Sequence, residues 1–206
     1  WDPAGVGGTT VRTATPWDPI MLTRFELLVK ALADHQLPDA SRGGALVALR
    51  DHPVLAQVNA PVPGLGSIRF KTPSPGSLAS YTRARFHDAL VRAFRAVVDQ
   101  FPAKYAYAAF FPVSDSTPSP TLTEATLARL TAEFNSGVVP RLGFFQENLT
   151  GTGPNPNGFA AHLVTARATT YLMLQACWSW SGMTPPQCTI GATETVGDGI
   201  KFGHDN

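Results

Sequence analysis

The segment from Leu78 to Phe111 reads LASYTRARFHDALVRAFRAVVDQFPAKYAYAAFF and decides the fold class. In its first part, up to Phe101, apolar residues recur every three or four positions, which is the period of a helix with one buried face. This stripe consists of Phe86, Leu90, Ala93, Phe94, Val97 and Phe101. The second part, from Lys104, is apolar at nearly every residue, as in a parallel strand that is buried on both faces. The segment therefore predicts a helix that leads into a buried parallel strand.

The same succession of apolar run, polar loop and helical segment recurs along the chain. Thr121 to Glu124 matches a capping box at the start of a helix that ends at Gly137. Asp18 and Pro19 match the N-cap and first-turn proline of a helix that runs through Leu32. Three more apolar runs lack the alternation of a half-exposed strand. They are Val54 to Ala60, Arg141 to Gln146 and Thr170 to Cys177.

This alternation predicts an α/β fold in a single domain over residues 1–206, with the four runs as neighbouring parallel strands in chain order. Enzymes of the TIM (β/α)8 class build their sites from loops that follow the strands. The loops after the predicted strands are long, which favours part of a TIM barrel over an open, doubly wound sheet. They cover 61–77, 112–120, 148–157 and 179–187. A partial barrel leaves open strand edges, so we expect the chain to associate or to be poorly soluble.

The charge balance excludes several classes of partner. Sixteen Lys and Arg against fifteen Asp and Glu leave a net charge of +1, without a run of like charges. This argues against a nucleic-acid binder and against a polybasic membrane anchor. No apolar stretch approaches the length of a membrane span, and the first residues do not read as a signal peptide. Because the chain opens on Trp1 rather than Met, we expect a processed, trimmed or incomplete chain.

The sequence predicts no cofactor and no metal. No glycine-rich phosphate fingerprint follows a predicted strand. No two of the five histidines stand at metal-ligand spacing, and those at 87 and 162 are expected on helix surfaces. Cys177 and Cys188 lie eleven positions apart across a turning segment. They are either a disulfide or two buried thiols, because the compartment that decides between these states is not known.

The most conspicuous polar stretch follows the third apolar run. Gln146, Glu147 and Asn148 come directly after Phe145, so the sequence places a carboxylate among amides at the carboxyl end of a buried strand. Such a position predicts a catalytic carboxylate with two substrate-binding neighbours. The alternative is that Glu147 caps a helix or pairs with an arginine such as Arg141 or Arg167, because structural ion pairs are common.

A second carboxylate, Asp115, follows the run that ends at Phe111 and is expected at the same edge. Two carboxyl groups about 5 Å apart can act as nucleophile and general acid on a glycosidic bond, and about 6.5 to 9.5 Å apart as base and acid. The simpler interpretation, which we favour at this stage, is a turn aspartate that bonds its own backbone.

The fourth run ends in Gln175, followed by Trp178 and Trp180. Indole faces stack on the CH groups of a sugar ring, and amides bond its hydroxyls, so this combination predicts a carbohydrate ligand. One of the two tryptophans is expected to serve packing instead.

The chain resembles barrel glycoside hydrolases of the cellulase-like and β-galactosidase-like group. The resemblance rests on Thr15 to Pro19, His52 to Ala60 and Gly143 to Asn148, and it covers most of the chain from Trp17 onward. It implies that the four runs are the fourth to seventh strands of a barrel whose first strands and last strand lie outside this chain. In that group a glutamate follows the fourth strand and another follows the seventh. Neither is present here, so no catalytic residue is carried over, and Asp115 and Glu147 fall on the fifth and sixth strands.

These observations favour a secreted or surface carbohydrate-active protein that hydrolyses or binds a glycan, with Glu147 and Asp115 as its carboxylates. The alternative is a catalytically inactive barrel that binds a glycan or a protein partner through the same loops, which the missing strand-end glutamates favour. A third possibility is an α/β enzyme of unrelated chemistry. Fold analogy alone does not decide among them. The sequence predicts neither the sugar, nor the stereochemical outcome, nor the oligomeric state.

Overall fold

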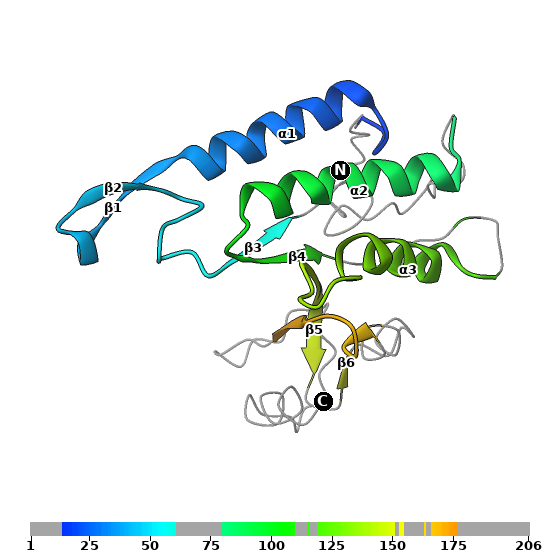
Figure 1. Cartoon of the computed structure of the whole chain (residues 1–206). Coiled ribbons are helices and arrows are strands. Elements are labelled where there is room, and N and C mark those ends of the chain that lie inside the picture. Colours follow the sequence, from blue (N-terminus) through cyan, green and yellow to red (C-terminus); the bar gives the residue numbers. More distant parts are fainter. Residues whose placement is uncertain are drawn as a thin grey trace, which may run out of the picture.

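The computed structural model describes residues 14–60, 80–109, 115, 119–150, 153–154, 163 and 166–176 (Figure 1). Its helices are α1 (Pro19–Asp34), α2 (Arg83–Gln100) and α3 (Leu122–Phe134), with a short 3-10 helix η1 (Ala40–Arg42). Its strands are β1 (Gln36–Asp39), β2 (Ala45–Ala48), β3 (Gln57–Ala60), β4 (Tyr105–Ala109), β5 (Leu142–Thr150), β6 (Gly153–Pro154) and β7 (Leu172–Ala176). No helix within these residues is long and apolar enough to cross a membrane.

Four strands form a parallel sheet in chain order. β3 pairs with β4, β4 with β5, and β5 with β7, each in parallel. This arrangement confirms the predicted α/β class and the predicted neighbours. The strands are shorter than the apolar runs at their amino ends: β3 begins at Gln57 rather than Val54, and β7 at Leu172 rather than Thr170. The described strands form an open sheet and not a closed barrel.

The predicted caps position the helices. Asp18 Oδ1 accepts a hydrogen bond from the Met21 amide at 2.9 Å, and Pro19 occupies the first turn of α1. The capping box of α3 is complete, because the Thr121 side chain accepts from the Glu124 amide and Glu124 reaches back.

Two helix ends differ from the sequence prediction. α2 begins after Thr82 rather than at Leu78, because the Thr82 hydroxyl accepts from the Arg85 amide at 3.1 Å and caps the helix there. α3 ends at Phe134, before Gly137. The reason is Asn135, whose amide oxygen accepts from the amide of Leu142 at 3.0 Å and whose amide nitrogen donates to the Leu142 carbonyl at 2.8 Å. This side chain therefore ties the end of α3 to the start of β5.

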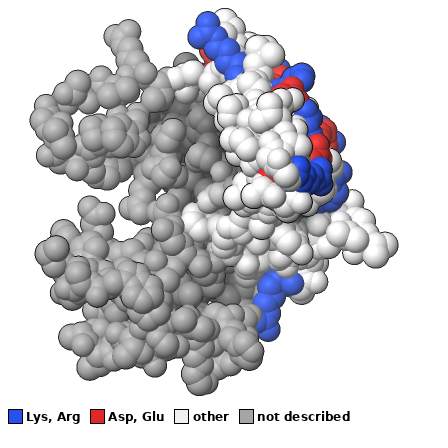
Figure 2. Space-filling view, turned by 90° about the vertical axis from the view of Figure 1, so that its left-hand side faces the viewer, with Lys and Arg blue, Asp and Glu red and all other residues white. Residues whose placement is uncertain are grey.

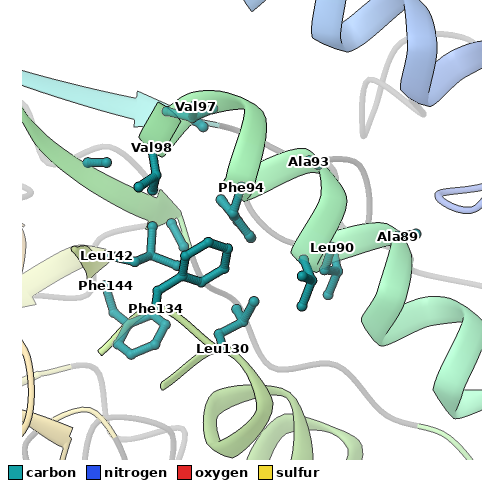
Figure 3. Close-up of a cluster of buried hydrophobic side chains, with 14 of the residues drawn as sticks. Ala89, Leu90, Ala93, Phe94, Val97, Val98, Leu130, Phe134, Leu142 and Phe144 are labelled. Carbon is teal, nitrogen blue, oxygen red and sulfur yellow. The ribbon is translucent and has the colours of Figure 1, made fainter. Parts of the chain in front are cut away.

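The main core lies between the helices and one face of the sheet (Figure 3). Leu90 and Phe94 of α2 are fully buried, as is Phe144 of β5. Ala106 and Ala108 of β4 are small residues that are buried in the same core. The predicted apolar stripe of α2 is thus the face that packs onto the sheet.

The opposite face of the sheet bears a second, smaller cluster. Tyr107 and Phe145 are buried there, packed with the partly buried Tyr171 and Met173. The expectation that every run is buried on both faces is wrong for β3, where Gln57 and Asn59 are exposed. The reason is position, because β3 is the first strand of the sheet and has a neighbour on one side only among the described residues.

The hairpin of β1 and β2 is not foreseen by the sequence pattern. Its strands are antiparallel and only four residues long each. Between them Gly43 and Gly44 take φ angles of 65° and 83°, a region in which side chains are strained. Asp39 accepts hydrogen bonds from the amide and hydroxyl of Ser41 and so caps η1. The hairpin is therefore fixed by local turn chemistry rather than by a long apolar pattern.

Candidate functional site

At the carboxyl edge of the sheet, two predicted site residues are paired across adjacent strands. Glu147 of β5 is the backbone partner of Gln175 of β7, two positions beyond the pair Phe145 and Met173. The predicted residues Gln146 and Asn148 flank Glu147 on β5. Because the two strands are parallel, the sequence positions chosen separately for a carboxylate and for an amide meet at the same end of the sheet.

The ladder is irregular at this point. The register between β5 and β7 shifts between Glu147 and Leu149, so one residue of β5 is inserted there. Beyond the shift β5 continues to Thr150 and turns back as β6. Bulges of this kind often lie next to active sites, where they redirect a side chain. Trp178 and Trp180, the predicted stacking residues, lie outside the described residues.

Aromatic side chains near the amino ends of the strands pack on the face of the sheet away from the helices. The rings of Tyr107 and Tyr171 meet edge to face, with centroids 5.0 Å apart and planes at 83°. The hydroxyl of Tyr171 lies 3.0 Å from the carbonyl oxygens of both Ala106 and Arg141, so it links β7 to β4 and β5. Burial raises the pKa of Tyr171, which keeps this phenol neutral.

Gly143 leaves the space in which the rings of Tyr107 and Tyr171 pack edge to face. It lies on β5 between Tyr107 and Tyr171 in the register, and a Cβ atom there would stand 2.8 Å from Cδ1 of Tyr107 and still closer to the ring of Tyr171. Real Cβ atoms essentially never approach so closely. The glycine is therefore required by the ring packing and not by a turn.

Asp115 is held in a buried ion pair. Its side chain is 3% exposed, and its two oxygens accept hydrogen bonds from Arg83 at 2.6 and 3.0 Å. Tyr81 donates to the same carboxylate at 2.6 Å, and burial together with this contact raises the pKa of Tyr81 to about 12. A third nitrogen of Arg83 donates to the Pro120 carbonyl at 2.8 Å. The guanidinium thus joins the start of α2 to both ends of segment 115–120.

The sequence pattern could not reveal these partners. Tyr81 and Arg83 lie 34 and 32 positions before Asp115, in a different element. The sequence shows only that Arg83 lies outside the apolar stripe of its helix. This position is equally typical of an arginine that contacts solvent, so it does not indicate an ion pair with Asp115.

His87 is not on the helix surface, which corrects the sequence prediction. It is half buried between α2 and α3, and its Nε2 lies 3.1 Å from the hydroxyl of Thr126. That hydroxyl donates to the Leu122 carbonyl at 2.6 Å, so it accepts from the Nε2 proton. Burial, with the charges of Arg83 and Arg129, lowers the pKa of His87. His162, the other histidine of this prediction, lies outside the described residues.

A shallow pocket of about 270 Å³ lies at the opposite, amino end of the strands. Its two cations hold the fold together, because Lys104 donates to the His52 carbonyl at 2.9 Å and Arg141 to the Val98 carbonyl at 3.0 Å. Predicted site residues are not among its lining. The lining residues include Phe101, Pro102, Tyr105, Val139, Pro140 and Tyr171.

Charges on the described surface are mixed. Figure 2 shows Lys and Arg largely interspersed with Asp and Glu on this face of the molecule. Many are paired, as in the contacts of Arg92 with Glu26 and of Arg129 with Glu133. No group of three or more His, Cys, Asp or Glu that could hold a metal occurs within the described part of the chain.

Comparison with known proteins adds no assignment. No protein-family model, no curated protein and no solved structure matches this chain.

Proposed function

We propose that this chain is a carbohydrate-active protein built as a segment of a (β/α)8-type barrel, with its glycan site at the carboxyl edge around Glu147 and Gln175. One observation carries the proposal: these two residues are register partners on adjacent parallel strands. The chain-order neighbours, with helices packed on one face, are consistent with a barrel segment. Barrel enzymes place their chemistry at this end of the strands.

The residue types suit a hydroxyl-rich ligand. In this proposal Gln175, Gln146 and Asn148 hydrogen-bond sugar hydroxyls, because an amide both donates and accepts. Glu147 is the carboxylate that either binds a hydroxyl or acts as an acid or base on the glycosidic oxygen. One of the indoles of Trp178 and Trp180 stacks on the sugar ring, and the other serves packing.

We assign Asp115 a positioning role rather than a catalytic one. A general acid in a glycosidase needs a raised pKa so that it carries a proton at neutral pH. The bidentate contact with Arg83 favours the charged carboxylate instead. Among the described residues, Glu147 is then the one predicted carboxylate left for chemistry at this edge, and this favours the second candidate function, a module that binds a glycan without hydrolysing it.

The test combines binding with turnover. Wild-type protein and the Glu147→Gln variant are titrated calorimetrically with soluble oligosaccharides and incubated with a panel of chromogenic glycosides. If Glu147 is catalytic, turnover falls about 100-fold or more in the variant while binding is retained. If it binds the ligand, affinity falls instead. Asp99→Asn, which changes an exposed carboxylate on α2, is the matched control and leaves both unchanged. A wild-type protein that neither binds nor cleaves any member of the panel refutes the proposal.

A further inference from the structure

The parallel sheet has two outer strands within the described residues, β3 and β7. Tyr105 donates its amide proton to the Ala56 carbonyl at 3.2 Å. Because amides alternate in direction along a parallel strand, those of Val58 and Ala60 then face β4, and those of Gln57 and Asn59 face outward. Both outward residues are exposed. This edge is therefore able to pair with another strand.

Helix α1 packs against α2, the helix that lies over β3 and β4, and α1 is apolar on two sides. Leu22, Val29 and Ala33 are buried. Four more large apolar residues are exposed to between 49% and 64%; they are Ile20, Leu27, Leu28 and Leu32. A helix that is apolar over most of its circumference is typical of one covered on both sides. Several large apolar residues exposed together on one helix mark an interaction surface.

The sheet itself indicates what covers this surface. Helices α2 and α3 pack on one face, and aromatic residues line the other, as outside and inside of a barrel wall. The wall consists of four parallel strands in chain order, and eight such strands close a barrel. A second copy brings four more parallel strands to the four that the structure describes, with edges that fit in the same direction.

We propose that two copies of this chain associate about a two-fold axis, with β7 of each beside β3 of the other, to close an eight-stranded parallel barrel. Each of the two equivalent junctions joins β7 of one copy to β3 of the other. The assembly therefore ends at a dimer in which both outer strands of the described sheet are paired. The exposed side of α1 is then buried at the junction with the second copy. The partner is thus specified by strand direction, strand number and an apolar helix face together.

The assembly deepens the proposed function and, in this step, rests on it. β5 is the third of the four strands, so the β5 strands of the two copies lie opposite one another across the barrel. Both copies of Glu147 then stand at one mouth. The dimer supplies the second carboxylate that a glycosidase needs and that Asp115, bound to Arg83, does not provide.

The first measurement is the mass in solution of the full chain, by light scattering on a size-exclusion column at about 100 μM, far above a micromolar dissociation constant. Wild-type protein is expected at twice the monomer mass of 22.0 kDa. Leu28→Glu places a charge on the exposed stripe without touching the core of the chain, and it raises the dissociation constant about 100-fold or more. Thr23→Glu, also exposed on α1, is the matched control and keeps the dimer. A monomeric wild type, or a dimer that Leu28→Glu does not weaken, overturns the proposal.

The second measurement locates the junction. Asn59→Pro removes an outward amide while leaving the β3 to β4 ladder intact, and it is expected to yield folded monomers with wild-type circular dichroism. In wild-type protein, hydrogen exchange at the amides of Gln57 and Asn59 slows as concentration rises through the dissociation constant. If these amides are equally protected in the Leu28→Glu variant, the chain covers its own edge and the proposal is wrong. Mass and exchange do not depend on a glycan, so failure of the dimer and failure of glycan binding are separate results.

Discussion

Substituting Gly143 by alanine tests the aromatic packing on the face of the sheet away from the helices. The added methyl group meets the rings of Tyr107 and Tyr171, both closer than an ordinary contact. The ring of Tyr171 cannot simply rotate away, because its hydroxyl is bound to Ala106 and Arg141. The variant must therefore either displace this ring or shift β5.

The cost follows from two contributions. Overpacking a well-packed core costs about 1 to 3 kcal/mol. Displacement of Tyr171 also breaks the contacts of its hydroxyl, and a typical hydrogen bond contributes about 0.5 to 1.5 kcal/mol. We therefore expect the Gly143→Ala variant to lose about 2 to 4 kcal/mol of unfolding free energy, a large part of the stability of a domain of this size.

The assay is urea denaturation of four proteins that form a double-mutant cycle: wild type, Gly143→Ala, Tyr171→Leu and the combination. In the Tyr171→Leu background the methyl group at position 143 has room. Gly143→Ala therefore lowers the unfolding free energy less in that background than in wild-type protein. The expected coupling is about 1 to 2 kcal/mol, in the range measured for residues in contact. Gly137→Ala is the control, since a Cβ atom there meets nothing within 4 Å.

Two results would refute this reasoning. One is a Gly143→Ala variant within about 0.5 kcal/mol of wild type, the range of ordinary surface substitutions. The other is an additive cycle, which would show that the methyl group and the Tyr171 ring do not compete for the same space.

Three further outcomes are expected. Leu90→Ala, in the centre of the buried face of α2, lowers the unfolding free energy by about 2 to 5 kcal/mol in urea denaturation, and a value near zero would contradict the packing of α2 on the sheet. Asp115→Asn leaves the partly buried Arg83 without its counter-charge and costs about 3 kcal/mol of unfolding free energy; calorimetry with the same oligosaccharides shows a lower affinity, because the loop that Asp115 positions is no longer fixed before binding. The lowered pKa of His87 means that the unfolded chain binds a proton more readily, so stability is full above the ordinary pKa of 6.5 and falls below it. Denaturation midpoints between about pH 7 and pH 5 should show this loss in wild-type protein, and His87→Gln should reduce it.

The sequence predicted the elements whose pattern is local and long. The spacing of Phe86, Leu90 and Phe94 predicted the buried face of α2, because eighteen residues of helix repeat the pattern several times. The capping box of α3 and the proline of α1 are local hydrogen-bond chemistry, and both are present. The β1 to β2 hairpin was missed because four-residue strands repeat no pattern.

For the candidate site too, one part could be predicted from the sequence and another could not. The positions of Glu147 and Gln175 at strand ends could be predicted, since each follows its own apolar run. Their pairing could not, because register depends on contacts between segments 28 positions apart and on the bulge after Glu147. The partners of Asp115 are equally distant in the chain, so an apparent turn residue proved to lie in an ion pair.

The contacts of Arg83 have a consequence for the ordering entropy of a ligand complex. One guanidinium holds Asp115 and the carbonyl of Pro120, so the two ends of this loop are fixed before any ligand arrives. Binding that orders a loose rim must give up conformational freedom, and the affinity falls by that amount. Here the loop loses much of this conformational freedom when the chain folds, and the burial of the apolar face of α2 offsets that loss. On the β4 side the carboxyl edge is thus preorganised, and a ligand there keeps more of the free energy of its own contacts.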